Sequence, residues 1–128
     1  MKKKVLIVVS DYYEDIANAL LDSTKKFLNK KIKFNIIKVP GVFEIPIIIS
    51  KNINKFDGFV AIGCVIKGKT AHFELISKSV IDAIMNLSID SKKPIGNCIL
   101  TCFNYKQALA RKKKGREAAI ALNSILYK

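Results

Sequence analysis

Two apolar runs, Val5–Ser10 and Phe59–Val65, constrain the fold of this chain more than any other feature. Hydrophobic residues follow one another in both runs instead of alternating with polar ones, and the second run is rich in β-branched side chains. A strand with one face in water alternates, whereas a strand covered on both faces does not. The two runs therefore predict buried strands of a parallel sheet.

The rest of the chain alternates between helical and strand patterns. Ile16, Leu20 and Phe27 recur at helical spacing. The segment Val42–Ile49 is ambiguous because isoleucine favours strands, but a helix with Pro46 in its first turn supplies the crossover that parallel neighbours need. In order, the sequence predicts a helix that ends near Lys30, a strand over Lys31–Val39, the helix over Val42–Ile49, a helix that begins at Ala71 or His72, a strand over Pro94–Thr101, and helices over Tyr105–Arg111 and Gly115–Tyr127.

Strands that alternate with helices in this way predict an α/β protein. We expect a single domain over residues 1–128, built as a three-layer α/β/α sandwich around a four-stranded parallel sheet. Ligands bind beyond the carboxyl ends of the strands in such sheets. The predicted ends are Ser10–Tyr13, Pro40–Glu44, Val65–Thr70 and Leu100–Asn104.

The third of these ends has the features of an anion site. A strand that feeds a helix through Lys67-Gly68-Lys69-Thr70 presents free backbone N–H groups and the positive end of a helix dipole. The single histidine, His72, follows directly. An imidazole with a pKa of ~6.5 can move protons near neutral pH, although the alternative is a histidine that merely opens a helix. The loop matches neither a Walker A motif nor a dinucleotide fingerprint.

Four other positions have both a functional and a structural interpretation. Glu44 is either a hydrogen-bond acceptor for a polar ligand or a first-turn partner of a helix dipole. Tyr12 and Phe43 either stack on a planar ring or belong to the core. Arg111 lies in a basic run and is either a phosphate ligand or a solvated surface charge. The residues alone therefore indicate a phosphate-bearing ligand beside a histidine acid/base.

Composition argues against several classes of protein. Half of the residues are hydrophobic and the mean hydropathy is +0.20, so disorder is not expected. No apolar stretch approaches the ~20 residues that span a bilayer, and we expect a cytoplasmic protein. The three cysteines form no Cys-x-x-Cys pair, so no zinc site is indicated. The net charge of +13 comes from lysines scattered along the chain, and no specific nucleic-acid function is predicted.

Four stretches together resemble the 6,7-dimethyl-8-ribityllumazine synthase family. They are Val39–Pro46, Gly63–Glu74, Ile99–Thr101 with Gln107, Ala108 and Arg111, and Lys114-Gly115 with Glu117–Ala119. The resemblance implies a flavodoxin-like architecture and a transferase of the penultimate step of riboflavin biosynthesis. Such an enzyme condenses 5-amino-6-(D-ribitylamino)uracil with 3,4-dihydroxy-2-butanone 4-phosphate and releases phosphate and water. No metal or organic cofactor is implied.

The resemblance also implies roles for individual residues. Those implied to contact the pyrimidine or its ribityl chain are Tyr12, Val42, Phe43, Glu44, Cys64, Val65, Ile66 and Asn97. Those implied to bind the phosphate are Lys69, Thr70, Lys114 and, from an adjacent subunit, Arg111. His72 occupies the position of the proton donor. Asn97 stands where many members carry an aromatic residue over the pyrimidine, and Lys69 where the residue is usually small.

The implied partners are small-molecule substrates and further copies of the chain. The family forms pentamers with active sites between subunits, and some members assemble into icosahedral shells. Three other functions share parts of the pattern. A nucleic-acid-binding module would bind in a salt-dependent way that does not involve His72. A flavodoxin-like electron carrier is disfavoured by the acidic turn after Ser10, and a receiver domain by the lack of an aspartate at Cys64–Ile66.

Overall fold

The two apolar runs form neighbouring central strands of one sheet, β1 (Lys3–Ser10) and β3 (Gly58–Ile66). The computed structural model describes residues 2–69 and 72–128. Its strand order is β2-β1-β3-β4, with β2 (Ile32–Val39) and β4 (Ile95–Cys102) at the edges and every pair parallel. Nearly all of β1 and β3 is buried, as the lack of alternation predicted.

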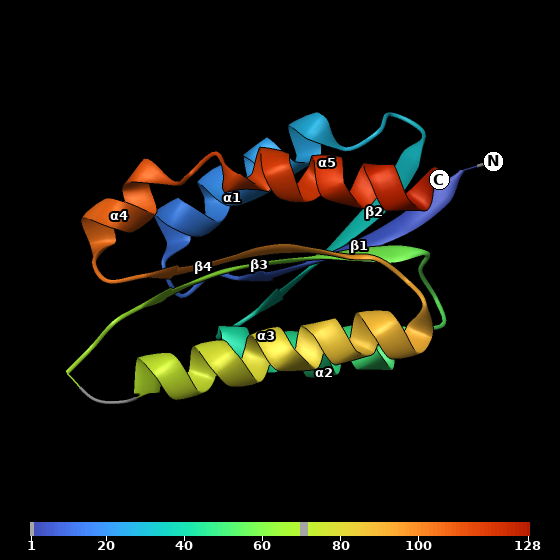
Figure 1. The fold of residues 1–128 in the computed structure, drawn as a ribbon. Helices are drawn as coiled ribbons and strands as arrows, with labels where there is room; N and C mark the ends of the chain where they lie inside the picture. Colours follow the sequence, from blue (N-terminus) through green and yellow to red (C-terminus); the bar gives the residue numbers. More distant parts are fainter. Residues whose placement is uncertain (1, 70–71) are drawn as a thin grey trace.

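Helices cover both faces of this sheet (Figure 1). On one face lie α1 (Glu14–Phe27), α4 (Tyr105–Ala110) and α5 (Lys114–Leu126). On the other lie the 3-10 turn η1 (Val42–Glu44), α2 (Ile45–Lys51) and α3 (His72–Ser91). The predicted three-layer α/β/α arrangement with a four-stranded parallel sheet is confirmed.

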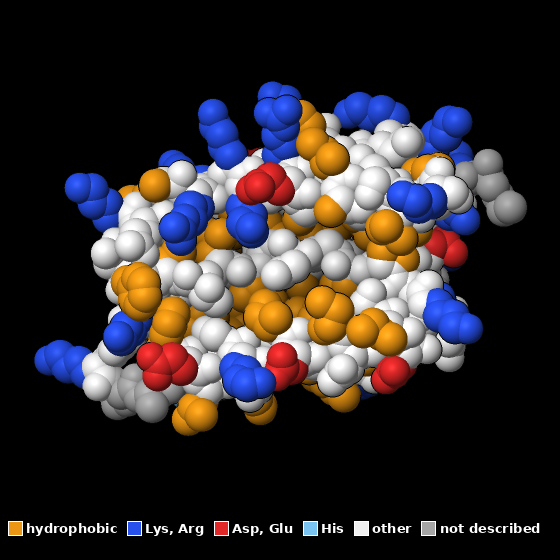
Figure 2. All heavy atoms as spheres, in the orientation of Figure 1, with side chains coloured by type: hydrophobic (Ala, Val, Ile, Leu, Met, Phe, Trp, Pro, Cys, Tyr) orange, Lys and Arg blue, Asp and Glu red, His pale blue; other side chains and the backbone are white. Residues whose placement is uncertain are grey.

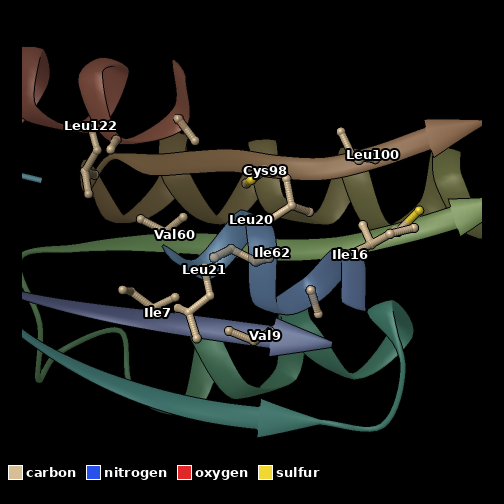
Figure 3. Close-up of a cluster of buried hydrophobic side chains, with 14 of the residues drawn as sticks. Ile7, Val9, Ile16, Leu20, Leu21, Val60, Ile62, Cys98, Leu100 and Leu122 are labelled. Atoms are coloured by element: carbon tan, nitrogen blue, oxygen red, sulfur yellow. The ribbon is translucent and has the colours of Figure 1, made fainter. Parts of the chain in front are cut away.

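The central strands supply side chains to two hydrophobic cores. Residues at odd positions of β1, such as Ile7 and Val9, pack under α1 and α5 together with Val60 and Ile62 of β3 (Figure 3). Residues at even positions of β1 pack under α2 and α3. Because successive side chains of a strand point to opposite faces, each central strand holds both helical layers.

The ambiguous isoleucine-rich segment is helical, as predicted. After Gly41 the chain makes the turn η1 and continues into α2, with Pro46 in the first turn of that helix. A first-turn N–H has no partner within the helix, so proline loses nothing there. Ile45 and Ile49 are fully buried against the sheet, which outweighs the preference of isoleucine for strands.

The predicted end of α1 near Lys30 is three residues too late. The helix ends at Phe27, and Leu28 is extended and buried. The side chain of Asn123 in α5 explains this end. It donates to the carbonyl of Phe27 over 2.9 Å and accepts from the N–H of Asn29 over 3.0 Å. The side chain of a residue distant in sequence therefore forms hydrogen bonds with backbone groups that would otherwise bond within a longer helix.

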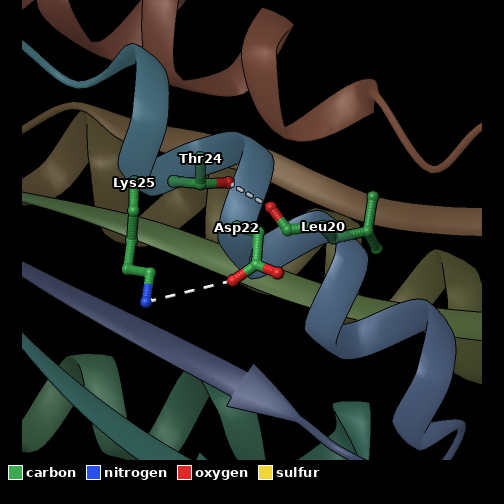
Figure 4. Close-up of polar contacts among 4 residues, drawn as sticks. All are labelled: Leu20, Asp22, Thr24 and Lys25. Carbon is green, nitrogen blue, oxygen red and sulfur yellow. Dashed lines mark hydrogen bonds and ion pairs between the residues drawn. The ribbon is translucent and has the colours of Figure 1, made fainter.

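Helices α1 and α5 are in close contact at Gly115. Thr24 is fully buried there, and its hydroxyl donates to the carbonyl of Leu20 over 2.9 Å (Figure 4). A Cβ on Gly115 would overlap that carbonyl oxygen and lie 2.7 Å from the Thr24 Oγ1. The nearby pair of Asp22 and Lys25, 4.0 Å apart and solvated, contributes little. The close contact between α1 and α5 thus depends on glycine at position 115, which has no side chain.

We expect Gly115→Ala to lower the free energy of unfolding by roughly 1–3 kcal/mol. The overlap involves backbone atoms that cannot move aside, and it outweighs the gain in helix propensity of about 1 kcal/mol. Denaturant unfolding at fixed protein concentration measures the change. The control is Gly68→Ala, where an added Cβ meets nothing within 4 Å. Equal stability of the two variants would contradict the packing argument.

Candidate active site

The site lies where the strand order reverses, between the carboxyl ends of β1 and β3. The chain leaves β1 towards β2 on one side and β3 lies on the other, and such a point opens a crevice in parallel sheets. Val9 pairs with Ile62, so β3 extends four residues beyond the last paired position. The overhanging residues Cys64, Val65 and Ile66 form one wall of the crevice.

A cavity of about 660 Å³ occupies this crevice. Seven of the sequence-predicted residues line it: Tyr12, Val42, Phe43, Cys64, Val65, Ile66 and His72. The structure therefore brings together candidates from the ends of β1 and β3 and from the segments η1 and α3. Four further lining residues, Ser10, Tyr13, Phe73 and Ile76, were not singled out from the sequence. Ser10 and Tyr13 fall within the predicted strand end Ser10–Tyr13, and this position was the sequence signal that could have identified them.

Gly63 allows η1 to reach the cavity floor. A Cβ at this position would lie 2.5 Å from the Cγ1 of Val42, so any side chain would displace the 3-10 turn. Glu44, at the end of the same turn, lines a neighbouring groove of about 550 Å³ between α2 and α3, which Phe43 also lines. The carboxylate of Glu44 lies over Gly41, 3.1 Å from where a Cβ would be.

Two exposed aromatic rings stand at the entrance. Tyr12 is 75% exposed and Phe43 is 63% exposed, so neither belongs to the core. The ring of Tyr13 meets that of Tyr12 edge-on at 5.0 Å between centroids. Burial, and then the neighbouring Tyr12, raises the pKa of the Tyr13 hydroxyl, which stays protonated at neutral pH. The rings offer flat surfaces of the kind that stack on a planar ligand.

The predicted anion loop follows the cavity wall. The N–H of Lys67 donates to the carbonyl of Cys102 over 2.9 Å, which ties the loop to the end of β4. The ammonium of Lys67 lies 5.5 Å from the centre of the Phe103 ring. Gly68 and His72 line the cavity, and Lys69 is exposed beside them. Thr70, the other predicted phosphate ligand, lies outside the described residues.

Charge is distributed unevenly over this site. Among the described lining residues, His72 is the one whose side chain can carry a positive charge. Burial, and secondarily the neighbouring Cys102, raises the pKa of the Cys64 thiol to about 12. Cys64 is therefore a neutral wall residue at neutral pH. A largely apolar cavity with one imidazole in its lining and exposed lysines beside it suits a ligand with a planar part and an anionic part.

Five predicted site residues in the described part of the chain do not line this cavity: Glu44 and Lys69, described above, and Asn97, Arg111 and Lys114. Asn97 pairs with Ala61, well before the carboxyl end of β4, and its Oδ1 accepts from the N–H of Ile99 over 3.0 Å. Arg111 follows α4, with its Nη1 3.7 Å from the Sγ of Cys102. Lys114 begins α5. No group of three His, Cys, Asp or Glu side chains in the described part of the chain could hold a metal ion.

Comparisons with known proteins match nearly the whole chain. A family described as 6,7-dimethyl-8-ribityllumazine synthase matches residues 2–127. The chain is 41% identical to the 6,7-dimethyl-8-ribityllumazine synthase of Agrobacterium fabrum over 133 aligned residues, covering 94% of this chain and 90% of that protein. It is 43% identical to the enzyme of that name from Bartonella henselae, covering 88% of this chain and 76% of the relative.

We expect the cysteines to react slowly with a thiol reagent at pH 8 in the folded protein and rapidly after unfolding. All three are buried, and burial raises the pKa of Cys64 and of Cys98 to about 12, so little thiolate is present. Labelling of Cys64 should speed up as the pH rises beyond 9. Colorimetric thiol titration, with Cys64→Ala as the control, measures this. Rapid labelling of one thiol per native chain at pH 8 would contradict it.

Proposed function

This chain belongs to the 6,7-dimethyl-8-ribityllumazine synthase family, and on that premise we propose that it catalyses the lumazine-forming step of riboflavin biosynthesis. It is a transferase that condenses 5-amino-6-(D-ribitylamino)uracil with 3,4-dihydroxy-2-butanone 4-phosphate and releases phosphate and water. One observation carries this proposal. Two of the four segments that resemble the family, Val39–Pro46 and Gly63–Glu74, converge on one cavity with aromatic rings, an imidazole and a basic loop beside it.

The pyrimidine substrate fits the apolar part of the site. Tyr12 would stack on its ring, and the backbone of Cys64, Val65 and Ile66 would face the ring edge. Val42, Phe43 and Glu44 would follow the ribityl chain out of the cavity. The position of Phe43 and Glu44 along the groove between α2 and α3 supports this path, because Phe43 lines both the cavity and the groove.

The phosphate of the second substrate fits the loop between β3 and α3. Lys69 and Thr70 would bind it, and the N-terminus of the 20-residue helix α3 adds a favourable dipole. Arg111 and Lys114 would add cationic donors from a neighbouring subunit. A phosphate dianion forms short, charge-assisted hydrogen bonds, so several donors converging on it are expected.

His72 is the proposed proton donor. It is the first residue of α3 and lines the cavity between the proposed pyrimidine and phosphate sites. Imine formation, loss of phosphate and ring closure each move a proton, and one imidazole can give and take protons in succession near neutral pH. Holding the two substrates side by side supplies much of the remaining acceleration. We propose no metal or organic cofactor.

We further propose that residues 1–128 form one domain that assembles into a homopentamer, alone or within an icosahedral shell of pentamers. Asn97, Arg111 and Lys114 are absent from the described lining of their own chain's cavity, which supports a site shared between subunits. Exposed Leu75, Met85 and Ile89 fall within about 80° of one another around α3, a surface that self-association would bury. Figure 2 shows hydrophobic side chains at the surface of this layer.

We propose a cytoplasmic location and no specific nucleic-acid partner. None of the helices in the described residues is long and apolar enough to cross a membrane. On the face shown in Figure 2, lysines and arginines outnumber acidic side chains over the layer of α1, α4 and α5, whereas acidic and basic side chains are mixed over the opposite layer. This excess of positive charge would attract phosphate-bearing substrates without selecting a nucleic-acid sequence.

We expect His72→Ala to lower kcat by about 10²-fold with little change in KM, because a proton donor acts mainly in the transition state. Absorbance of the lumazine product measures the rate. Lys78→Ala is the control, since Lys78 is exposed on the same helix and pairs with Asp82 at 2.6 Å. Equal rates for wild type and His72→Ala would remove His72 from this role, and no product from folded wild type would refute the function.

Mixed assemblies should reveal shared sites. When Arg111→Ala and His72→Ala chains are co-expressed with different tags in equal amounts, about one quarter of sites in a ring combine an intact His72 with an intact Arg111 from the neighbour. We therefore expect about a quarter of wild-type activity in purified mixed oligomers, and very little in either variant alone. Activity no higher than the parents would show that each site uses one chain only.

A further inference from the structure

Ser10, the last residue of β1, has a buried hydroxyl that lacks a hydrogen-bond partner. The residue is 2% exposed. In the described part of the chain, the Oγ atoms of Ser10 and Ser77 are the buried side-chain oxygens or nitrogens without a partner. Most buried hydroxyls in folded proteins are hydrogen-bonded, so each exception requires a physical explanation.

The position of Ser10 supplies one, because Ser10 lines the cavity of the active site and Ser77 does not. The alternation of β1 directs Ser10 to the same face as Leu6 and Val8, towards η1 and α3. Its Cβ lies 3.4 Å from where a Cβ of Gly63 would be, and Val42 packs against that same glycine. Ser10 is thus part of the floor between the end of β1 and the turn η1.

An apolar residue would suit this position better in the free protein. The other buried residues of β1, Val5 to Val9, are all aliphatic, and a buried hydroxyl without a partner is costly to desolvate. A ligand that enters the cavity can supply the partner that this hydroxyl lacks within the chain. A serine has a single side-chain torsion, so rotation about χ1 can turn the oxygen towards a ligand at low cost.

We propose that Ser10 is a substrate-binding residue whose hydroxyl hydrogen-bonds to a polar atom of 5-amino-6-(D-ribitylamino)uracil. This inference rests on the proposed function and extends its pyrimidine site. Tyr12, two residues further on, belongs to the proposed pyrimidine site, and Val42, beside Gly63, to the proposed path of the ribityl chain, whereas the proposed phosphate ligand Lys69 does not line the cavity. A hydroxyl can donate and accept, which matches the mixture of N–H, hydroxyl and carbonyl groups on this substrate.

The test compares Ser10→Ala with Ser77→Ala. Both variants remove one unpaired buried hydroxyl and nothing else, but only Ser10 lines the cavity. Calorimetric titration with the uracil substrate alone should give a Kd about tenfold higher for Ser10→Ala, the effect of one neutral hydrogen bond, and an unchanged Kd for Ser77→Ala. In the complete reaction, Ser10→Ala should raise KM for the uracil substrate and leave KM for the butanone phosphate unchanged.

Thermal unfolding of the free proteins provides a second readout. Both substitutions should leave Tm unchanged or raise it, because no bond is lost in the folded state. A lower Tm for Ser10→Ala alone would mean that its hydroxyl is already satisfied, for example by an internal water, and would overturn the proposal.

The remaining outcomes are also decisive. An equal Kd for wild type and Ser10→Ala, or an equal loss in Ser77→Ala, would overturn the proposal even if wild type forms the lumazine. If wild type binds the uracil but forms no lumazine, the proposed reaction fails while the comparison of Kd values still decides the role of Ser10. If wild type does not bind the uracil, both proposals fail.

Discussion

The pairing of β1 with β3 is the constraint on which the rest of the structure depends. Both strands are buried on both faces, so each must receive a helical layer on either side, and together they hold the two hydrophobic cores. Their register also creates the site. Because Val9 pairs with Ile62, the last residues of β3 project beyond β1 and form a wall, while Ser10 closes the floor. Folding and ligand binding therefore depend on the same alignment.

Close packing beside these strands determines the shape of the cavity. Gly63 admits Val42 to a position from which a side chain at residue 63 would exclude it, and this contact brings η1 to the floor of the cavity. The same turn directs Phe43 and Glu44 towards the groove between α2 and α3. A floor that is apolar except for Ser10 lies below two exposed rings, and the basic loop stands at one side. The shape and charge of the site thus provide one position for a planar ring and another for an anion.

In the proposed shared site, one chain would carry only part of the chemistry. The imidazole and both rings line its own cavity, whereas the guanidinium of Arg111 lies near Cys102 on the face covered by α1 and α5. Single chains of this kind would bind the ring of the first substrate better than the phosphate of the second. Assembly would then complete the anion site. The burial of the exposed apolar side chains of α3 and the catalytic reaction would both require neighbouring subunits.

The sequence by itself determined the architecture and most of the cavity wall. Continuous apolar runs in β1 and β3 predicted a doubly covered parallel sheet, and the carboxyl-end rule then placed Tyr12, Val42 and Val65 near one another. Their family resemblance assigned them to one site. These features are local or periodic, so a pattern in the sequence can carry them.

Contacts between distant residues were decided only by the tertiary structure. The end of α1 depends on Asn123, which is far away in sequence, and propensity at Leu28 gave no sign of it. The unpaired hydroxyl of Ser10 could not be read from a strand pattern either, because hydrogen bonding depends on every group that folds around it. The separation of Asn97 and Arg111 from the cavity likewise follows from register and helix packing. The periodicity of hydrophobic residues predicts which face of a helix or strand a side chain occupies. Which residue it contacts on a neighbouring element is decided by tertiary packing.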